Sequence, residues 1–129
     1  MTIQQVDVEI IRPLRSLVLR PGLPIEFTDY DRDKEFQTLH YANIINQKVC
    51  SIATFYPEPI LEVEALVAYR LRGMATHPNY RRQGLASSMM LQAMADIQKL
   101  GGDLLWFKAR LVAIDFYESL GFIKTGLIY

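Results

Sequence analysis

Residues 73–88 read GMATHPNYRRQGLASS, and this stretch joins a buried strand to a long helix. Residues 65–72 before it are mostly apolar, which is typical of a buried strand. Residues 85–100 after it repeat apolar side chains at helical spacing. Pro78 and Gly84 lie between the two and predict a turn. A strand that turns directly into a helix leaves the first four helix amides without internal hydrogen-bond partners.

This turn is a candidate site for a phosphate or pyrophosphate. Unpaired amides and the helix macrodipole place partial positive charge at the start of the helix, where anions bind. Gly84 and the small residues 86–88 leave room for a ligand, and Arg81 and Arg82 add formal charge. The two best-known phosphate loops do not fit, because no Lys follows Gly84 and only one of the three glycines of the dinucleotide motif is present.

The same stretch resembles the acyl-CoA pyrophosphate loop of the GNAT N-acetyltransferase superfamily. That loop reads Gln/Arg-x-x-Gly-x-Gly/Ala, and residues 81–86, RRQGLA, fit it with Ala86 in the final position. Residues 113–122, AIDFYESLGF, resemble the superfamily's last helix, Ala-x-x-Phe-Tyr-x-x-x-Gly-Phe. The resemblance covers roughly residues 39–124, and the region around residues 17–22 is similar to a subgroup of small, uncharacterised bacterial members.

The resemblance implies a single GNAT domain over residues 1–129, with an α+β fold. Its sheet is expected to be mixed and mostly antiparallel, with helices on both faces. The expected strands cover residues 6–11, 37–45, 48–56, 66–76, 103–109 and 122–129, and the expected helices cover residues 12–19, 85–100 and 111–120.

Two local features refine this topology. Asn46-Gln47 predicts a tight hairpin turn between the second and third strands. The strand–helix–strand connection from residues 66–76 to residues 103–109 predicts that these two strands are parallel. In the family the two strands splay apart, and the pantetheine arm of CoA lies in the opening.

The end of the chain departs from the family pattern. Two strands usually follow the last helix, whereas eight residues follow Gly121 here. The C-terminal part of the sheet is therefore expected to be truncated or to be completed by a partner chain. An unprotected edge with many apolar residues favours aggregation, so the sequence favours a homodimer.

Composition narrows the class of protein. The chain has 129 residues, of which 50% are hydrophobic, and its 14 basic and 14 acidic residues give a net charge of zero. Nucleic-acid binders normally carry a basic excess, so that class is disfavoured. No apolar run reaches the length of a membrane span, and Asp7 and Glu9 interrupt any signal-peptide pattern. With Cys50 as its single cysteine, the chain is expected to be cytoplasmic, without a membrane partner or a metal site.

The resemblance also implies acetyl-CoA as the cofactor, with CoA as the product. The backbone after Gly73 is expected to meet the pantetheine arm like an added strand, next to a bulge that Gly73 permits. Arg110 stands where many members have Asn, and two roles stay open for it: contact with a cofactor phosphate, or solvation. The expected cofactor-binding residues are Met74, Ala75, Thr76, Arg81, Arg82, Gln83, Gly84, Leu85, Ala86, Ser87, Arg110 and Tyr117.

Tyr117 is the expected catalytic residue. In many members this Tyr faces the CoA sulfur, and a phenol is a suitable acid toward a departing thiolate. The alternative is that Tyr117 only packs on the cofactor. A backbone amide at the bulge is expected to face the thioester oxygen. The sequence singles out no general base, and the candidates are Glu58, Glu62, Glu64, His40 and His77.

The predicted function is transfer of an acetyl group from acetyl-CoA to a primary amine of an unknown small-molecule or protein acceptor. The amine is expected to attack directly within a ternary complex. The alternative is a non-catalytic acyl-CoA-binding or assembly module on the same fold. Residues 23–35, rich in Asp and Arg, are either a solvated connector, the favoured interpretation, or a lid over the acceptor.

Overall fold

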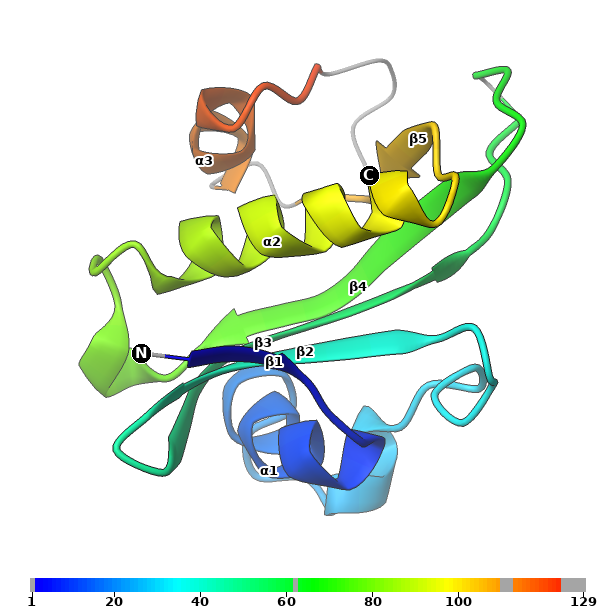
Figure 1. Ribbon diagram of the computed structural model, residues 1–129. Coiled ribbons are helices and arrows are strands. Elements are labelled where there is room, and N and C mark those ends of the chain that lie inside the picture. The colour runs from blue at the N-terminus through cyan, green and yellow to red at the C-terminus, as the bar shows by residue number, and fades with distance from the viewer. Residues whose placement is uncertain (1, 62, 110–112, 124–129) are drawn as a thin grey trace.

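The computed structural model describes residues 2–61, 63–109 and 113–123. It is a layered α+β structure in which α1 covers one face of a twisted sheet and α2 and α3 lie on the other side (Figure 1). The strands are β1 (Thr2–Gln5), β2 (Leu39–Ile45), β3 (Lys48–Pro57), β4 (Ala68–Thr76) and β5 (Leu104–Trp106). The helices are α1 (Val8–Leu19), α2 (Leu85–Lys99) and α3 (Ile114–Ser119), with short 3-10 turns η1 (Ile25–Thr28) and η2 (Pro78–Tyr80).

The strands follow one another in sequence order across the sheet, β1-β2-β3-β4-β5. The first three pairs are antiparallel, and β4 pairs with β5 in parallel. The expected fold class, with helices on both faces of a mixed sheet, is therefore confirmed. The β2–β3 hairpin is confirmed too, because Asn46 and Gln47 have φ values of 50° and 67°, as a type I′ turn requires at both central residues.

A β-bulge interrupts β4 at the predicted position. Ile52 pairs with Ala75 and Thr54 pairs with Arg72, so one residue of β3 opposes two of β4, Gly73 and Met74. Gly73 has a φ of 66°, a left-handed conformation that glycine adopts without steric cost.

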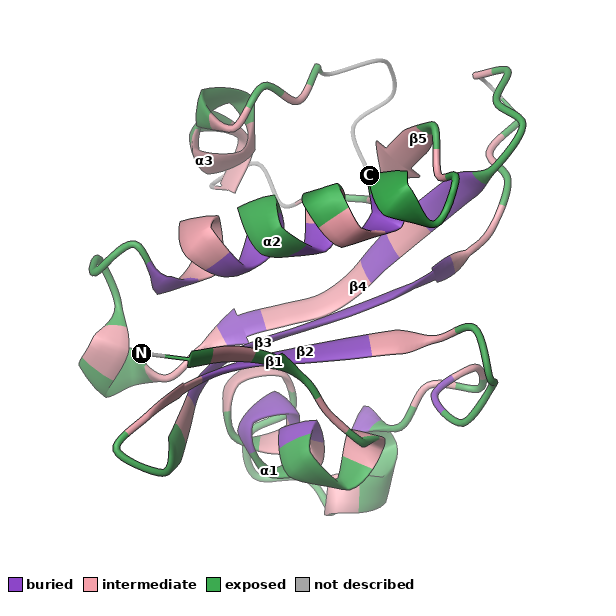
Figure 2. Ribbon diagram, in the orientation of Figure 1, coloured by how far each residue is buried: buried purple, intermediate pink, exposed green. Residues whose placement is uncertain are grey.

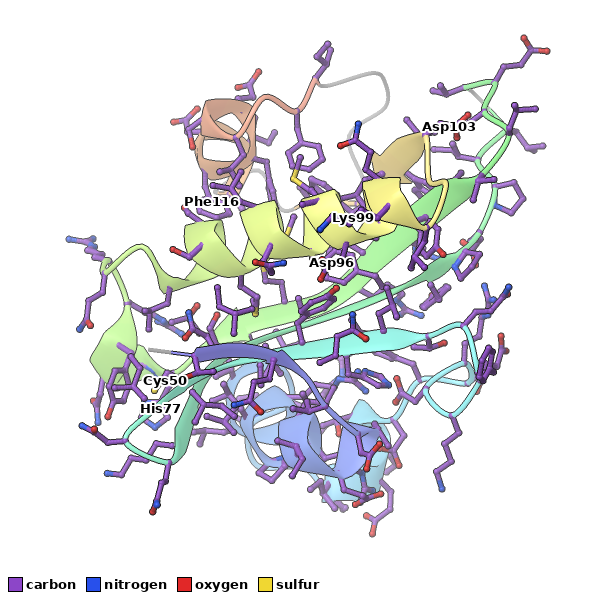
Figure 3. The ribbon with its side chains drawn as sticks, viewed as in Figure 1. Cys50, His77, Asp96, Lys99, Asp103 and Phe116 are labelled. Atoms are coloured by element: carbon purple, nitrogen blue, oxygen red, sulfur yellow. The ribbon has the colours of Figure 1, made fainter. Side chains whose placement is uncertain are left out.

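β4 and β5 are paired at their starts and part afterwards. Pairing covers Ala68–Arg70, and β4 then runs on to Thr76 without a β5 partner among the described residues. Asp103 fixes the paired end, because its carboxylate accepts the amides of Leu66 and Val67 at 2.8 and 2.9 Å (Figure 3). These backbone bonds hold the pKa of Asp103 below its usual value. The predicted splayed geometry follows from this one-ended pairing.

Two clusters of buried apolar residues hold α1 and α2 to the sheet. Buried residues are drawn in purple in Figure 2. Under α2 the cluster is formed by Tyr41, Ala53, Phe55, Tyr69, Leu71, Met89, Met90, Ala93 and Ile97. Under α1 the cluster is formed by Ile11, Leu14, Ala42, Ile52 and Ala75. Alternate residues of each strand thus serve opposite faces, as a two-sided sheet requires.

The predicted first strand, residues 6–11, is wrong. β1 ends at Gln5, and α1 begins at Val8 and includes Pro13 in its interior instead of its first turn. The apolar residues from Val6 to Ile10 alternate, but helical spacing continues through Ile11 and Leu14, which are buried against the sheet. Six alternating residues do not distinguish the period of a strand from that of a helix, and burial against the sheet favours the helix.

The remaining boundaries shift by a few residues. β4 begins at Ala68 instead of residue 66, and β5 ends at Trp106 instead of residue 109. The predicted strand at residues 122–129 lies mostly outside the described residues, and its described part, Phe122 and Ile123, is not a strand. Most of the edge that suggested a homodimer therefore also lies outside the described residues.

Candidate active site

The turn between β4 and α2 is built from strained and capped backbone. Arg82 and Gly84 have φ values of 63° and 74°, so two left-handed residues flank Gln83. A non-glycine residue with positive φ is uncommon and is kept only where the surrounding structure fixes it. His77 closes the start of the turn, because its Nδ1 accepts the Asn79 amide at 3.1 Å. This hydrogen bond makes His77 a cap of the turn, at the end of β4 in Figure 3.

The first amides of α2 form an open cradle. The Ser88 amide donates to the Gly84 carbonyl at 3.1 Å, which is the first helical bond, and no side chain of the described residues caps the start of the helix. Within the described ranges, the amides of residues 84–87 donate to no protein acceptor. A Cβ added at Gly84 would meet nothing within 4 Å, and Arg81 and Arg82 are exposed beside it. The cradle is therefore free to take an anion.

The backbone of β4 continues this cradle into the opening between β4 and β5. The His77 amide donates to the Cys50 carbonyl at 2.8 Å, so that peptide faces β3. Because antiparallel ladders alternate, the amide and carbonyl of Thr76 face away from β3, toward the side where β4 has no β5 partner among the described residues. The Ala75 side chain is buried under α1.

Asn43 fixes the cradle to the sheet and was not anticipated from the sequence. Its side chain is fully buried on β2, and Nδ2 donates to the Leu85 carbonyl at 3.3 Å. Its Oδ1 is buried without a hydrogen-bond partner in the described part of the chain. A lone Asn within an apolar strand carries no pattern that would have marked this contact in advance.

Tyr117 lies in an aromatic cluster at the far side of the opening. Its ring centroid is 4.2 Å from that of Phe107, 5.1 Å from that of Phe116 and 6.1 Å from that of Phe122. Phe107 directly follows β5, so Tyr117 stands beside the strand that parts from β4. Burial raises the pKa of Tyr117 to about 12, and the phenol therefore stays protonated at neutral pH.

The segment between α1 and β2, residues 20–38, packs on the α1 face of the sheet at the bulge. A Cβ added at Gly73 would lie 3.0 Å from Tyr30 Cε2 and Oη. The Tyr30 ring is held between two guanidinium groups, with Arg15 Cζ and Arg72 Cζ each 4.1 Å from its centroid. The favoured interpretation of residues 23–35 as a solvated connector is thus wrong for this part, because buried contacts fix Tyr30 and Asp33.

The proposed bases fall into different environments. His40 is buried between Thr54 Oγ1 and the Asp33 carbonyl, each 2.8 Å from a ring nitrogen, and burial lowers its pKa. Glu58 accepts from Arg70 Nη1 at 2.9 Å and is therefore charge-paired. Glu64 is exposed, and Glu62 lies outside the described residues.

The other predicted site residues surround the cradle. Arg81, Arg82, Gln83 and Gly84 are exposed, while Leu85 is buried and anchors α2. Ala86 and Ser87 are half-buried in the first helical turn, as are Met74 and Thr76 on β4. Arg110 lies outside the described residues. The structure thus brings together the β4 backbone and the turn before α2, with the Tyr117 cluster beside β5.

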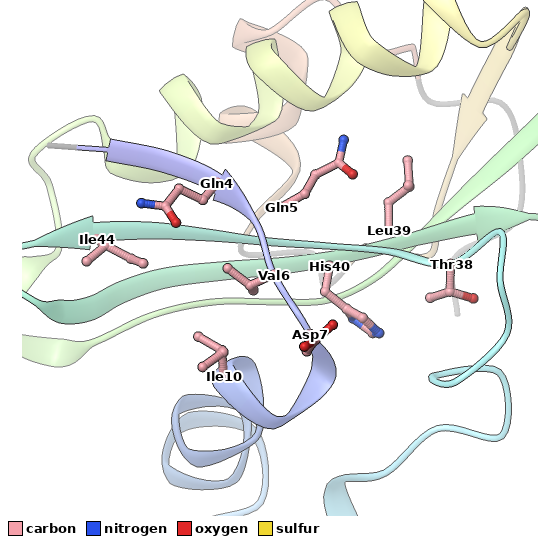
Figure 4. Close-up of a pocket in the computed structure, with 9 residues that line it drawn as sticks. All are labelled: Gln4, Gln5, Val6, Asp7, Ile10, Thr38, Leu39, His40 and Ile44. Carbon is pink, nitrogen blue, oxygen red and sulfur yellow. The ribbon is translucent and has the colours of Figure 1, made fainter.

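A separate hollow lies at the opposite edge of the sheet. It is bounded by β1, the start of α1 and β2, and Gln5, Asp7, Thr38 and His40 are among its lining residues (Figure 4). Its surface is open and mixed in polarity, and no residue of the 73–88 turn lines it.

Among the described residues, no cluster of three metal-ligating side chains occurs, and no helix has both the length and the apolar character of a membrane span.

Known proteins resemble this chain in sequence and in fold. A family model of the acetyltransferase (GNAT) domain matches residues 38–124. The chain is 31% identical over 124 residues, 96% of its length and 83% of the relative's, to the uncharacterized N-acetyltransferase YitI of Bacillus subtilis. It is 38% identical over 60 residues, 44% of its length and 40% of the relative's, to the ribosomal protein bS18-alanine N-acetyltransferase of Escherichia coli. The aminoglycoside N-acetyltransferase AAC(6')-Iy, solved in complex with CoA, superposes with a TM-score of 0.84 at 16% identity, covering 99% of this chain and 91% of that one.

Proposed function

We propose that this chain, which belongs to the GNAT acetyltransferase family, transfers the acetyl group of acetyl-CoA to a primary amine by direct attack in a ternary complex. One observation carries the proposal. The unpartnered amide cradle of α2 lies directly beyond the end of β4, which has parted from β5. A long cofactor with an anionic middle and a slender, amide-containing arm matches both features.

The pyrophosphate of acetyl-CoA would bind the amides of residues 84–87, with Arg81 and Arg82 as charge partners. Helix N-termini with free amides are suited to this task. The pantetheine arm would lie along the Met74 and Thr76 peptides, adding to β4 as a strand does. The CoA held by the structurally similar aminoglycoside N-acetyltransferase supports this placement. Arg110 stays a candidate phosphate contact.

In the transfer itself, the amine nitrogen attacks the thioester carbon to form the C–N bond of a tetrahedral intermediate, and the C–S bond breaks when that intermediate collapses. The oxyanion of the tetrahedral intermediate needs a fixed donor, and the amide at the Gly73–Met74 bulge is the proposed one. The departing thiolate takes a proton from the Tyr117 hydroxyl, which is kept protonated by its raised pKa. The amine's proton leaves through water, because Glu58 and His40 are both engaged in internal contacts.

A thermal melt with and without acetyl-CoA tests the proposal. At about 100 times Kd, ligand binding stabilises the native state by roughly 2.7 kcal/mol. For a domain of this size the melting temperature should rise by about 5–15 °C. A nucleotide that lacks the pantetheine arm is the control and should give a smaller shift. Binding followed by free-thiol release with an amine distinguishes an enzyme from a passive acyl-CoA-binding module, and no shift at millimolar acetyl-CoA would contradict the proposal.

A further inference from the structure

We infer that the amine acceptor carries a carboxylate, and that Arg72, supported by Arg70, binds it. The inference rests on the proposed acetyl transfer and names the class of its acceptor. It comes from the charges on the α1 face of β4, next to the bulge. The acceptor class is an amino-acid-like molecule in which the reacting amine and a carboxylate are close together.

The two arginines point to the face of the sheet opposite α2. Tyr69 and Leu71 pack in the cluster under α2, so the alternation of a strand directs Arg70 and Arg72 to the other face. Arg72 directly precedes Gly73, where the bulge begins. If the thioester lies at the bulge, the Arg72 guanidinium lies on the side from which an acceptor reaches it.

The Arg72 charge is held in place and is not neutralised. Its guanidinium stacks over the Tyr30 ring at 4.1 Å, and the residue is half-buried. Within the described ranges, no carboxylate oxygen lies within 4.0 Å of it. Arg15, on the other side of the same ring, is paired with Asp33 at 2.6 Å. A half-buried guanidinium with no carboxylate in direct contact can donate charge-assisted hydrogen bonds to an anionic ligand.

Arg70 places a second guanidinium on the same face. Its Nη1 is occupied by Glu58 at 2.9 Å, and its guanidinium stacks over Trp106 at 4.8 Å. Its Nε is buried and has no hydrogen-bond partner in the described part of the chain. Together Arg70 and Arg72 have one carboxylate partner, Glu58, among the described residues. A planar carboxylate from the acceptor matches the fork of donors that a guanidinium presents.

The same charges disfavour a polycationic acceptor. A polyamine or a multiply charged amino sugar would place its remaining ammonium groups beside Arg72, where like charges repel. The carboxylate of an amino-acid-like acceptor would instead be attracted to these guanidinium groups. The charge of the acceptor is therefore the property that the site selects.

The test compares acceptors that differ in the carboxylate alone. Lysine, histidine and tyrosine are each assayed with acetyl-CoA against their carboxamides and against cadaverine, histamine and tyramine, with free-thiol release as the readout. For at least one set, kcat/KM should be about 10- to 100-fold higher for the carboxylate, as a charge-assisted hydrogen bond provides. Arg72→Gln should lower kcat/KM far more for the carboxylates than for the carboxamides, and so abolish that preference.

Two controls separate this effect from a folding defect. Arg20→Gln removes an exposed arginine whose side chain bonds, among the described residues, only the neighbouring Leu19 carbonyl, and it should leave the preference intact. Arg72→Lys keeps the charge but loses the fork, so it should retain part of the preference. Thermal shifts with acetyl-CoA should match the wild type in all three variants.

Equal rates for carboxylates and carboxamides, or an equal loss on both in Arg72→Gln, would overturn the inference while leaving the acetyltransferase proposal standing. If no member of the sets is turned over, melting of the CoA-bound protein with the same compounds decides. The inference would be supported if a carboxylate-bearing amine stabilises the wild type and Arg72→Gln abolishes this stabilisation. It would be overturned if none of these carboxylates stabilises the wild type. Failure of the wild type to bind acetyl-CoA at all would overturn the proposed function and this inference with it.

Discussion

Arg15 on α1 and Asp33 before β2 form a buried, bidentate ion pair. Nη1 lies 2.6 Å from Oδ2 and Nη2 lies 3.1 Å from Oδ1, and both side chains are almost fully buried. Asp33 Oδ2 also accepts the Tyr30 amide at 2.9 Å. The pair therefore holds Tyr30 against the Gly73 bulge, and it links the stability of the fold to the shape of the sheet face beside the bulge.

Removing one member of this pair should destabilise the protein strongly. Asp33→Ala leaves the Arg15 guanidinium buried without its counter-ion, and such changes cost about 3–5 kcal/mol. Asp29→Ala is the matched control, because Asp29 makes a similar bidentate contact with Arg12 at the surface, where ion pairs contribute little. Urea unfolding followed by circular dichroism measures both. Similar midpoints for the two variants would show that burial of the Arg15–Asp33 pair does not govern stability.

The amide cradle is tested at Gly84. Gly84→Glu and Gly84→Ala impose the same cost at a φ of 74°, but only Glu places a carboxylate at the proposed pyrophosphate site. Two like charges about 4 Å apart near a protein surface repel by roughly 4 kcal/mol, so CoA affinity should fall on the order of 100- to 1,000-fold for Glu. Isothermal titration with CoA measures the affinity, and the Ala variant should lose far less. Equal affinities in the two variants would place the pyrophosphate elsewhere.

Much of this architecture was predictable because its determinants are local. Asn46-Gln47 specified the hairpin, since the turn needs two residues that tolerate positive φ. The family resemblance implied the bulge, which Gly73 permits, and the strand–helix–strand order required β4 and β5 to be parallel. The cradle was predictable for the same reason, because its donors are backbone groups set by where α2 begins.

The contacts of Tyr30 and Asn43 were not predictable, because they join distant segments. Tyr30 meets Gly73 and Arg72 only after the 20–38 segment has folded over the sheet. Asn43 meets the Leu85 carbonyl across two elements that are far apart in the chain. Neither contact has a spacing that a pattern could reveal. The error at α1 has a different origin, because its first residues fit a strand and a helix equally well.

The role of Tyr117 is separated from packing by Tyr117→Phe. The ring and its contacts with Phe107 and Phe122 remain, and only the hydroxyl is lost. A general acid contributes typically 100- to 10,000-fold, so the single-turnover rate should fall by about that factor while CoA affinity stays constant. Rapid-mixing measurement of thiol release at saturating acceptor isolates the chemical step. An unchanged rate would leave Tyr117 with packing alone.

The pH dependence of the single-turnover rate should also reflect the raised pKa of Tyr117. Because burial lifts this pKa to about 12, the proton-donating form persists below that pH and is lost only above it. The single-turnover rate of the wild type should therefore show no decline between about pH 8 and pH 10 from loss of the phenol proton, which an unperturbed tyrosine would lose near pH 10. A decline centred near pH 10 that is absent from Tyr117→Phe would show that the hydroxyl titrates as an exposed phenol.

His40 should make the fold less stable in mild acid. Burial lowers its pKa in the folded state, while the unfolded chain has the ordinary value of 6.5. The unfolded state therefore binds the proton first, so stability is fully present above about pH 6.5 and declines as the pH falls from there toward the folded-state pKa. Asp29 and Asp103, whose pKa values are lowered in the folded state, affect stability only in more acidic solution, below the ordinary aspartate pKa of 3.8. Urea midpoints measured from pH 7.5 to pH 5 should decline in the wild type and stay flatter in His40→Gln, with His77→Gln as the control that keeps the decline. A decline of the same size in His40→Gln would assign the acid sensitivity to other groups.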